Sequence, residues 1–219
     1  MPHHFEDLLD QLREKVARMT ASVQQEVEQA VESVINIDIK LARQVVEGDR
    51  RIDEEEVQIE KSAIDLLALF QPAASDLRLI TTIIKVNGDF ERIADCAVNV
   101  AQRVPNLAAD TAYKPPNDLR IMGNTVIALL RDTIKAFNLP DPQLAQHVLK
   151  SDDVVDALYH QIVHDMLGMM EAGGQQASLD LSNIMIAKNL ERIADHCTNI
   201  AENVVYVASG RIIRHLHTA

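Results

Sequence analysis

The amino-acid sequence predicts an all-α fold of two tandem three-helix bundles related by an internal duplication. Apolar residues recur every three or four positions along the 219 residues, and no segment sustains the period-two alternation of a β-strand. Turn-forming residues are scarce, with seven Gly and seven Pro, and aromatic residues make up only 3%. Both facts disfavour a many-stranded β fold. In addition, two blocks of sequence occur twice, which indicates a duplicated unit.

The first helix is predicted from apolar residues that lie three or four positions apart, from Phe5 onward. Nothing interrupts this pattern before about Asn36. Asp38 is a favourable N-cap, because its carboxylate can accept from the N–H groups of the next turn. We therefore expect a short helix over 39–47, which Gly48 closes.

Two longer helices are expected to complete the first bundle. One should run over about 49–70, where Gln71-Pro72 breaks it, because Pro lacks an N–H group and disfavours helix at the residue before it. The other should run over about 75–104.

A linker is predicted where the helical pattern stops. The stretch 105–117 contains three Pro in a polar context. The predicted organisation is a first three-helix bundle at 1–107, a linker at 108–117 and a second three-helix bundle at 118–219.

The repeat is visible in two blocks. Residues 38–53 align with 141–156 at six identical positions of sixteen, and 89–101 align with 189–201 at seven of thirteen. The spacing between the copies falls by three residues from the first block to the second, so the first copy contains three extra residues. The turn at 71–75 is the natural place for them.

Charge and cysteine content exclude several classes of function. The chain has 21 Lys and Arg against 33 Asp and Glu, a formal charge of −12, which argues against nucleic acid as a partner. Two cysteines, Cys96 and Cys197, are too few for a disulfide framework and fit a reducing compartment. No apolar run is long enough for a membrane span, and 1–10 lacks the pattern of a signal peptide. We expect a cytoplasmic protein.

Acidic residues recur in both copies as acid-x-x-x-acid pairs. Positions i and i+4 share one helix face, where like charges repel by a few tenths of a kcal/mol. A local cost that occurs four times suggests that bound cations offset it. The predicted metal ligands are Asp49, Asp53, Glu91 and Asp95 in the first copy, and Asp152, Asp156, Glu191 and Asp195 in the second.

If the second and third helices of each bundle pack together, two pairs can form one four-carboxylate patch per bundle. Carboxylate oxygens suit Mg²⁺, Ca²⁺, Mn²⁺ or iron. Further ligands could come from Asn99, Asn199 and His196. The alternative is an ordinary charged surface, in which Arg50, Arg51, Arg92 and Arg192 pair with the acids.

The sequence resembles the PhoU family over essentially its whole length. The resemblance is strongest at 71–78 (QPAASDLR), 89–95 (DFERIAD) with Asn99, and 189–202 (NLERIADHCTNIAE), and it extends to 1–12 and 204–210.

This resemblance implies a usually dimeric tandem of three-helix bundles whose acid pairs bind metal ions or clusters, with iron, manganese, magnesium or zinc as candidates. It implies a negative regulator of the phosphate regulon that controls phosphate uptake. The expected partners are the ATPase subunit of the phosphate ABC transporter and the phosphate sensor histidine kinase, and the membrane is approached only through them. No catalysis is expected.

The sequence departs from the usual family pattern at a few positions. Phe70 stands where Gln is common, and Ala94 and Ala194 stand where Gly is common. Asp89 is matched by Asn189, so the two patches are expected to be unequal. A metal-dependent phosphohydrolase and a purely structural helical scaffold remain alternatives, although no nucleophile or base is evident beyond the carboxylates.

Overall fold

The computed structural model describes residues 2–172 and 176–210, and the predicted all-α fold is confirmed in both ranges. These ranges contain helices and no strand, and none of their helices has a stretch long and apolar enough to cross a membrane. The helices are α1 (Pro2–Asn36), α2 (Ile39–Phe70), α3 (Ala74–Ala101), α4 (Val104–Leu107), α5 (Asn117–Asn138), α6 (Pro142–Glu171) and α7 (Ala177–Ser209).

Local sequence explains where several helices begin and end. Asp38 caps α2 as predicted, because its carboxylate accepts from two N–H groups of the first turn at 2.9 and 3.0 Å. Asp141 forms the same cap at the start of α6. At its other end α2 stops at Phe70, since Gln71 takes a left-handed φ of 47° and Pro72 follows.

The predicted break at Gly48 is wrong, because α2 is continuous over 39–70. Val45 and Ile52, seven positions apart, are both buried, so the apolar stripe continues past the glycine. Burial of this stripe outweighs the roughly 1 kcal/mol that a helical Gly costs relative to Ala. At the end of the bundle, α3 stops at Ala101, slightly earlier than predicted, and the short α4 follows.

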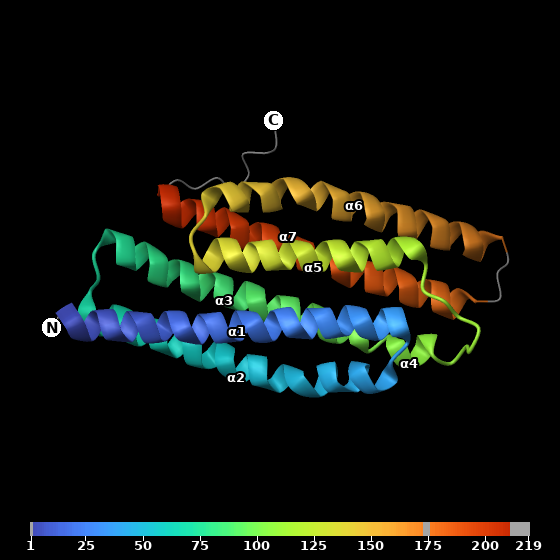
Figure 1. The fold of residues 1–219 in the computed structure, drawn as a ribbon, viewed down its shortest axis with the longest axis horizontal. Coiled ribbons are helices and arrows are strands. Elements are labelled where there is room, and N and C mark those ends of the chain that lie inside the picture. The colour runs from blue at the N-terminus through green and yellow to red at the C-terminus, as the bar shows by residue number, and fades with distance from the viewer. Residues whose placement is uncertain (1, 173–175, 211–219) are drawn as a thin grey trace.

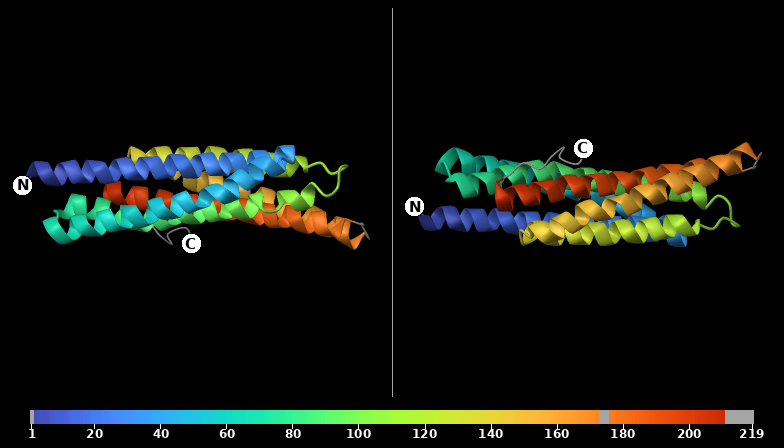
Figure 2. Two further views of the ribbon diagram at one scale, coloured as in Figure 1. Left: turned by 90° about the horizontal axis from the view of Figure 1, so that it is seen from below. Right: turned by 90° about the horizontal axis from the view of Figure 1, so that it is seen from above.

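The helices form two three-helix bundles that lie side by side. Helices α1, α2 and α3 pack together, as do α5, α6 and α7, while α3 packs on α7 and α1 on α5. Figures 1 and 2 show the long helices aligned along one axis, with the C-terminal ends of α2 and α6 at opposite ends of the molecule. One buried apolar cluster includes residues of both bundles, so the two bundles share a core.

Side chains of the two repeats contact each other across the interface between the bundles. Arg131 of α5 donates to one carboxylate oxygen of Glu28 on α1 through Nε at 3.0 Å and Nη2 at 2.7 Å. Residues 28 and 131 occupy the same position in their repeats, judged from the two aligned N-caps. In the core, Phe90 of α3 meets Phe137 of α5 edge to face, with ring centroids 5.8 Å apart.

Helix α4 and the segment between α4 and α5 bond to the start of α7. The amide of Asn106 donates to Ser182 Oγ at 2.7 Å. The hydroxyl of Tyr113 donates to Asn183 Oδ1. These bonds attach the chain that leaves the first bundle to a helix of the second.

Close packing of α1 on α5 depends on the absence of a side chain at Gly123. A Cβ at this position would lie 2.7 Å from Cγ1 of the buried Val31. Gly123→Val should therefore destabilise the fold by about 1–3 kcal/mol in denaturant unfolding. Gly168→Val, at an exposed helical glycine with open space around it, should change stability by less than about 0.5 kcal/mol. Equal effects of the two substitutions would contradict this account.

Candidate metal sites

Four predicted ligands lie together at the rim of the first bundle. We name Asp49 and Asp53 of α2, with Glu91 and Asp95 of α3, the first acidic patch. Burial raises the pKa of Asp49, and the charges of Asp53 and Asp95 raise it further. The pKa of Glu91 is raised by burial and then by Asp95, while Arg92 acts in the opposite direction. The acids of the two helices are therefore electrostatically coupled.

A fifth acid, Glu26 of α1, belongs to the same group. Its side chain is buried, with 6% of the residue exposed, and its Oε1 has no hydrogen-bond partner. Burial, followed by the charges of Asp49, Asp53 and Asp95, raises the pKa of Glu26 to about 8. A buried carboxylate oxygen without a donor is costly, so Glu26 is a candidate ligand for a cation.

Sequence comparison between the repeats could not find Glu26. The equivalent residue of the second copy is Leu129, which is buried. A search for acids common to both copies therefore misses Glu26. The available signal was local. Glu26 lies beside Val23 and Val27, which occupy the apolar stripe of the first helix, and an acid at such a position is unusual.

The second bundle has an equivalent group. We name Asp152 and Asp156 of α6, with Glu191 and Asp195 of α7, the second acidic patch. Burial, and then the charges of Asp156 and Asp195, raise the pKa of Asp152 to about 6, and its buried Oδ1 has no partner. Burial and Glu191 also raise the pKa of Asp195.

A lysine lies against the second acidic patch. The Nζ of Lys188 donates to both carboxylate oxygens of Glu191, at 2.8 and 2.7 Å. These bonds raise the pKa of Lys188. The same ammonium lies 5.3 Å from the ring centroid of Tyr159 on α6. The equivalent position of the first copy is Gly88.

The three additional predicted ligands have different surroundings. His196 faces the other bundle, where its Nδ1 lies 3.0 Å from Asp89 Oδ1. Asn99 is partly buried one turn beyond Asp95, whereas Asn199 is exposed. The partner of His196 is thus an acid of α3 outside both patches.

The arginines do not neutralise most of the patch acids. Arg50 pairs with Glu54 and Arg51 with Glu55, each at 3.1 Å. Arg92 lies 3.6 Å from Glu91. An ordinary surface ion-pair network therefore accounts for other acids of α2 better than for Asp49 and Asp53.

The donor set fits a hard cation, although the side chains are not gathered around one point. Within residues 2–172 and 176–210, no three His, Cys, Asp or Glu side chains form a group that could hold a metal ion as placed. Both patches consist of carboxylates. A buried oxygen without a donor accompanies each of them, that of Glu26 at the first patch and that of Asp152 in the second. Such oxygens suit Mg²⁺, Mn²⁺ or iron, and coordination would require the carboxylates to rotate inward.

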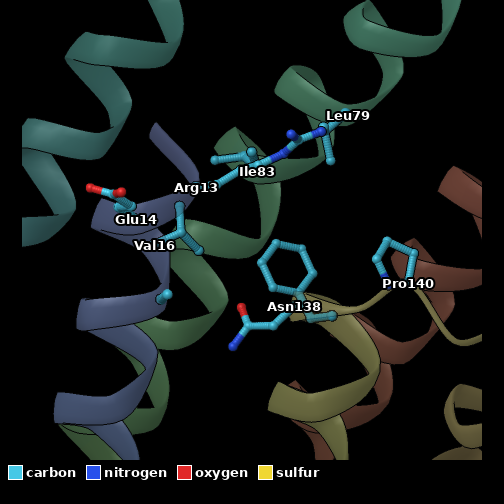
Figure 3. Close-up of a pocket in the computed structure, with 9 residues that line it drawn as sticks. Arg13, Glu14, Val16, Leu79, Ile83, Asn138 and Pro140 are labelled. Carbon is cyan, nitrogen blue, oxygen red and sulfur yellow. The ribbon is translucent and has the colours of Figure 1, made fainter. Parts of the chain in front are cut away.

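A separate apolar cleft lies between the two bundles. It has a volume of ≈ 480 Å³, and its lining includes Val16, Leu79, Ile83 and Pro140. In Figure 3, Val16 and Ile83 enter it from α1 and α3 while Glu14 points away. About two turns of α3 separate Ile83 from Glu91, so the cleft is distinct from the acidic patches.

The raised pKa of Glu26 predicts how metal-free protein responds to pH. Folded Glu26 holds its proton more tightly than unfolded Glu26, so the stability that this proton confers is complete below about pH 4.5 and is lost as pH rises towards 8. In the presence of a chelator, Glu26→Gln should remove most of this loss of stability. At pH 8 its free energy of unfolding, measured with denaturant, should exceed that of the wild type by roughly 2–4 kcal/mol.

The neighbouring Glu28 provides a control of opposite sign. Its pKa is lowered through bonds from Gln24 and Arg131, against a raising effect of burial. Glu28 therefore stabilises the fold at neutral pH, and this stabilisation is lost on acidification. Glu28→Gln should leave the decline in stability between pH 4.5 and 8 in place. A Glu26→Gln profile parallel to that of the wild type would refute the assignment.

Comparison with known proteins agrees with the fold and with the repeat. A sequence profile described as the PhoU domain matches twice, at residues 16–104 and 119–204. A Zymomonas mobilis protein named phosphate-specific transport system accessory protein PhoU homolog is 36% identical over 94% of this chain and 87% of its own.

Two solved structures are similar to the whole molecule. The crystal structure of PhoU from Pseudomonas aeruginosa has a TM-score of 0.90 and 36% identity, covering 94% of this chain and 100% of that one. The crystal structure of the phosphate transport system regulatory protein PhoU from Streptococcus pneumoniae has a TM-score of 0.89 and 26% identity, covering 95% and 98% of the two chains. The sequence profile matches most of the chain, in both bundles, and the chain therefore belongs to the PhoU family.

Proposed function

We propose that this protein is a metal-binding, non-catalytic regulator of phosphate uptake. The regulatory part rests on its similarity to proteins named for the phosphate transport system, over nearly the whole chain. The metal-binding part rests above all on Glu26, whose buried oxygen lacks a donor among four further acids. Because the donors are carboxylates, iron, manganese and magnesium are better candidates than zinc, which prefers Cys and His.

The proposed partners are the ATPase subunit of the phosphate ABC transporter and the phosphate sensor histidine kinase. The protein acts as a cytoplasmic homodimer and reaches the membrane only through these partners. Its formal charge of −12 favours basic contact zones on the partners, and attraction that weakens with added salt. Bound cations lower this negative charge locally, which gives metal a direct way to influence association.

Removal of two acids tests the metal site. Glu91→Ala combined with Asp95→Ala should weaken metal binding at the first acidic patch by at least about 100-fold, since loss of even an outer partner of a ligand weakens binding about 10–100-fold. Elemental analysis after gel filtration would measure the loss. Asp10→Ala combined with Glu14→Ala, an exposed acid pair of the same spacing, should retain the wild-type content. Unchanged metal in the first variant would remove these residues from the site.

Metal removal tests the regulatory role. Pull-down of the transporter ATPase and of the kinase should weaken severalfold after chelation and recover when Mn²⁺ or Fe²⁺ is returned. Partner binding that persists unchanged without metal would make the metal incidental to regulation. Turnover of phosphoesters by the metal-loaded protein would contradict the non-catalytic assignment.

A further inference from the structure

The two acidic patches differ at two equivalent positions, and each difference changes charge. Glu26 adds a buried acid to the first patch, where the second has Leu129. Lys188 adds an ammonium to the second patch, where the first has Gly88. The first patch thus gathers five acids, while the second gathers four acids and a lysine.

Lys188 already binds the carboxylate group of Glu191. Its Nζ contacts both carboxylate oxygens. The Glu191 side chain is 15% exposed and that of Lys188 44%, so the carboxylate is the better shielded partner. The contact with Tyr159 holds the ammonium from the facing helix. Charge-assisted bonds to both oxygens are stronger than ordinary hydrogen bonds.

The first patch has no comparable internal cation. Gly88 carries no side chain, and a Cβ added there would meet nothing within 4 Å. Arg92 lies 3.6 Å from Glu91, but its side chain is 61% exposed, and such a contact is weak. The buried Oε1 of Glu26 lacks any donor, so an incoming ion gains a ligand there without displacing a protein group.

We propose that Lys188 is a tethered cation that competes with metal for the second acidic patch, so that the first patch fills at lower metal concentration than the second. This inference rests on the proposed metal-binding function. An ion that enters the second patch must displace the ammonium from Glu191, whereas an ion that enters the first displaces no side chain, only the proton that Glu26 holds. Because of the lysine, the two patches of one chain fill over two different ranges of metal concentration.

Titration of metal-free protein with Mn²⁺, with free Mn²⁺ measured by its electron paramagnetic resonance, tests the proposal. The wild type should have one tight and one weaker class of Mn²⁺-binding site. Lys188→Met should tighten the weaker class roughly tenfold and leave the tight class unchanged. Gly88→Lys, the reciprocal change, should weaken the tight class.

Matched variants identify the two classes. Glu91→Ala combined with Asp95→Ala should leave only the weaker class. Lys85→Met provides the control, because Lys85 also lies near a tyrosine ring, that of Tyr206 at 5.9 Å. It should change neither class, and thermal unfolding would confirm that each variant is folded.

The outcomes separate this proposal from the one on which it rests. If the wild type binds no Mn²⁺, the proposed metal function fails. If it binds two ions and Lys188→Met alters neither class, metal binding stands and the competition is overturned. Equal tightening of both classes would also overturn it, because the effect would then be one of overall charge.

Discussion

The packing of α3 against α7 determines where every candidate ligand on these helices lies. The buried faces use Phe90, Ile93 and Ala97 on α3, and Ile193 and Ile200 on α7. With those positions committed to the core, Glu91, Asp95 and their equivalents fall on the adjacent stripe. Glu91, Asp95 and Glu191 are therefore half-buried because the helices must bury their neighbours, while Asp195 is exposed. The same apolar burial that stabilises the fold creates the electrostatic cost of the patches.

The cost of these acids to the metal-free protein is a sign that they are retained for function. Proteins tolerate locally destabilising features mainly at functional sites, and stabilising interactions elsewhere in the fold compensate for them. Glu26 is the clearest case, since an apolar residue is accommodated at the equivalent position of the second repeat. The duplication thus provides an internal comparison in which the same fold accommodates an acid at this position in one repeat and an apolar residue in the other.

Helical periodicity was sufficient to predict the all-α fold class and most helices, and comparison of the repeats was sufficient to predict an acidic group in each bundle. Other features depended on information that neither method contains. The continuity of α2 through Gly48 follows from burial of both neighbouring turns, which a local capping rule does not weigh. Lys188 resembles any helical surface lysine until the ring of Tyr159 is placed beside it. The pairing of His196 with Asp89 requires knowledge that α3 and α7 face each other.

The ion pair between Glu28 and Arg131 has a consequence for the two halves as separate molecules. These residues are equivalent in the repeats and meet across the interface of α1 and α5. Two identical first halves, docked in the same way, would place glutamate against glutamate, and two second halves would place arginine against arginine. Like charges at such positions repel. This single pair of residues thus favours the assembly of one half with the other over the pairing of either half with itself.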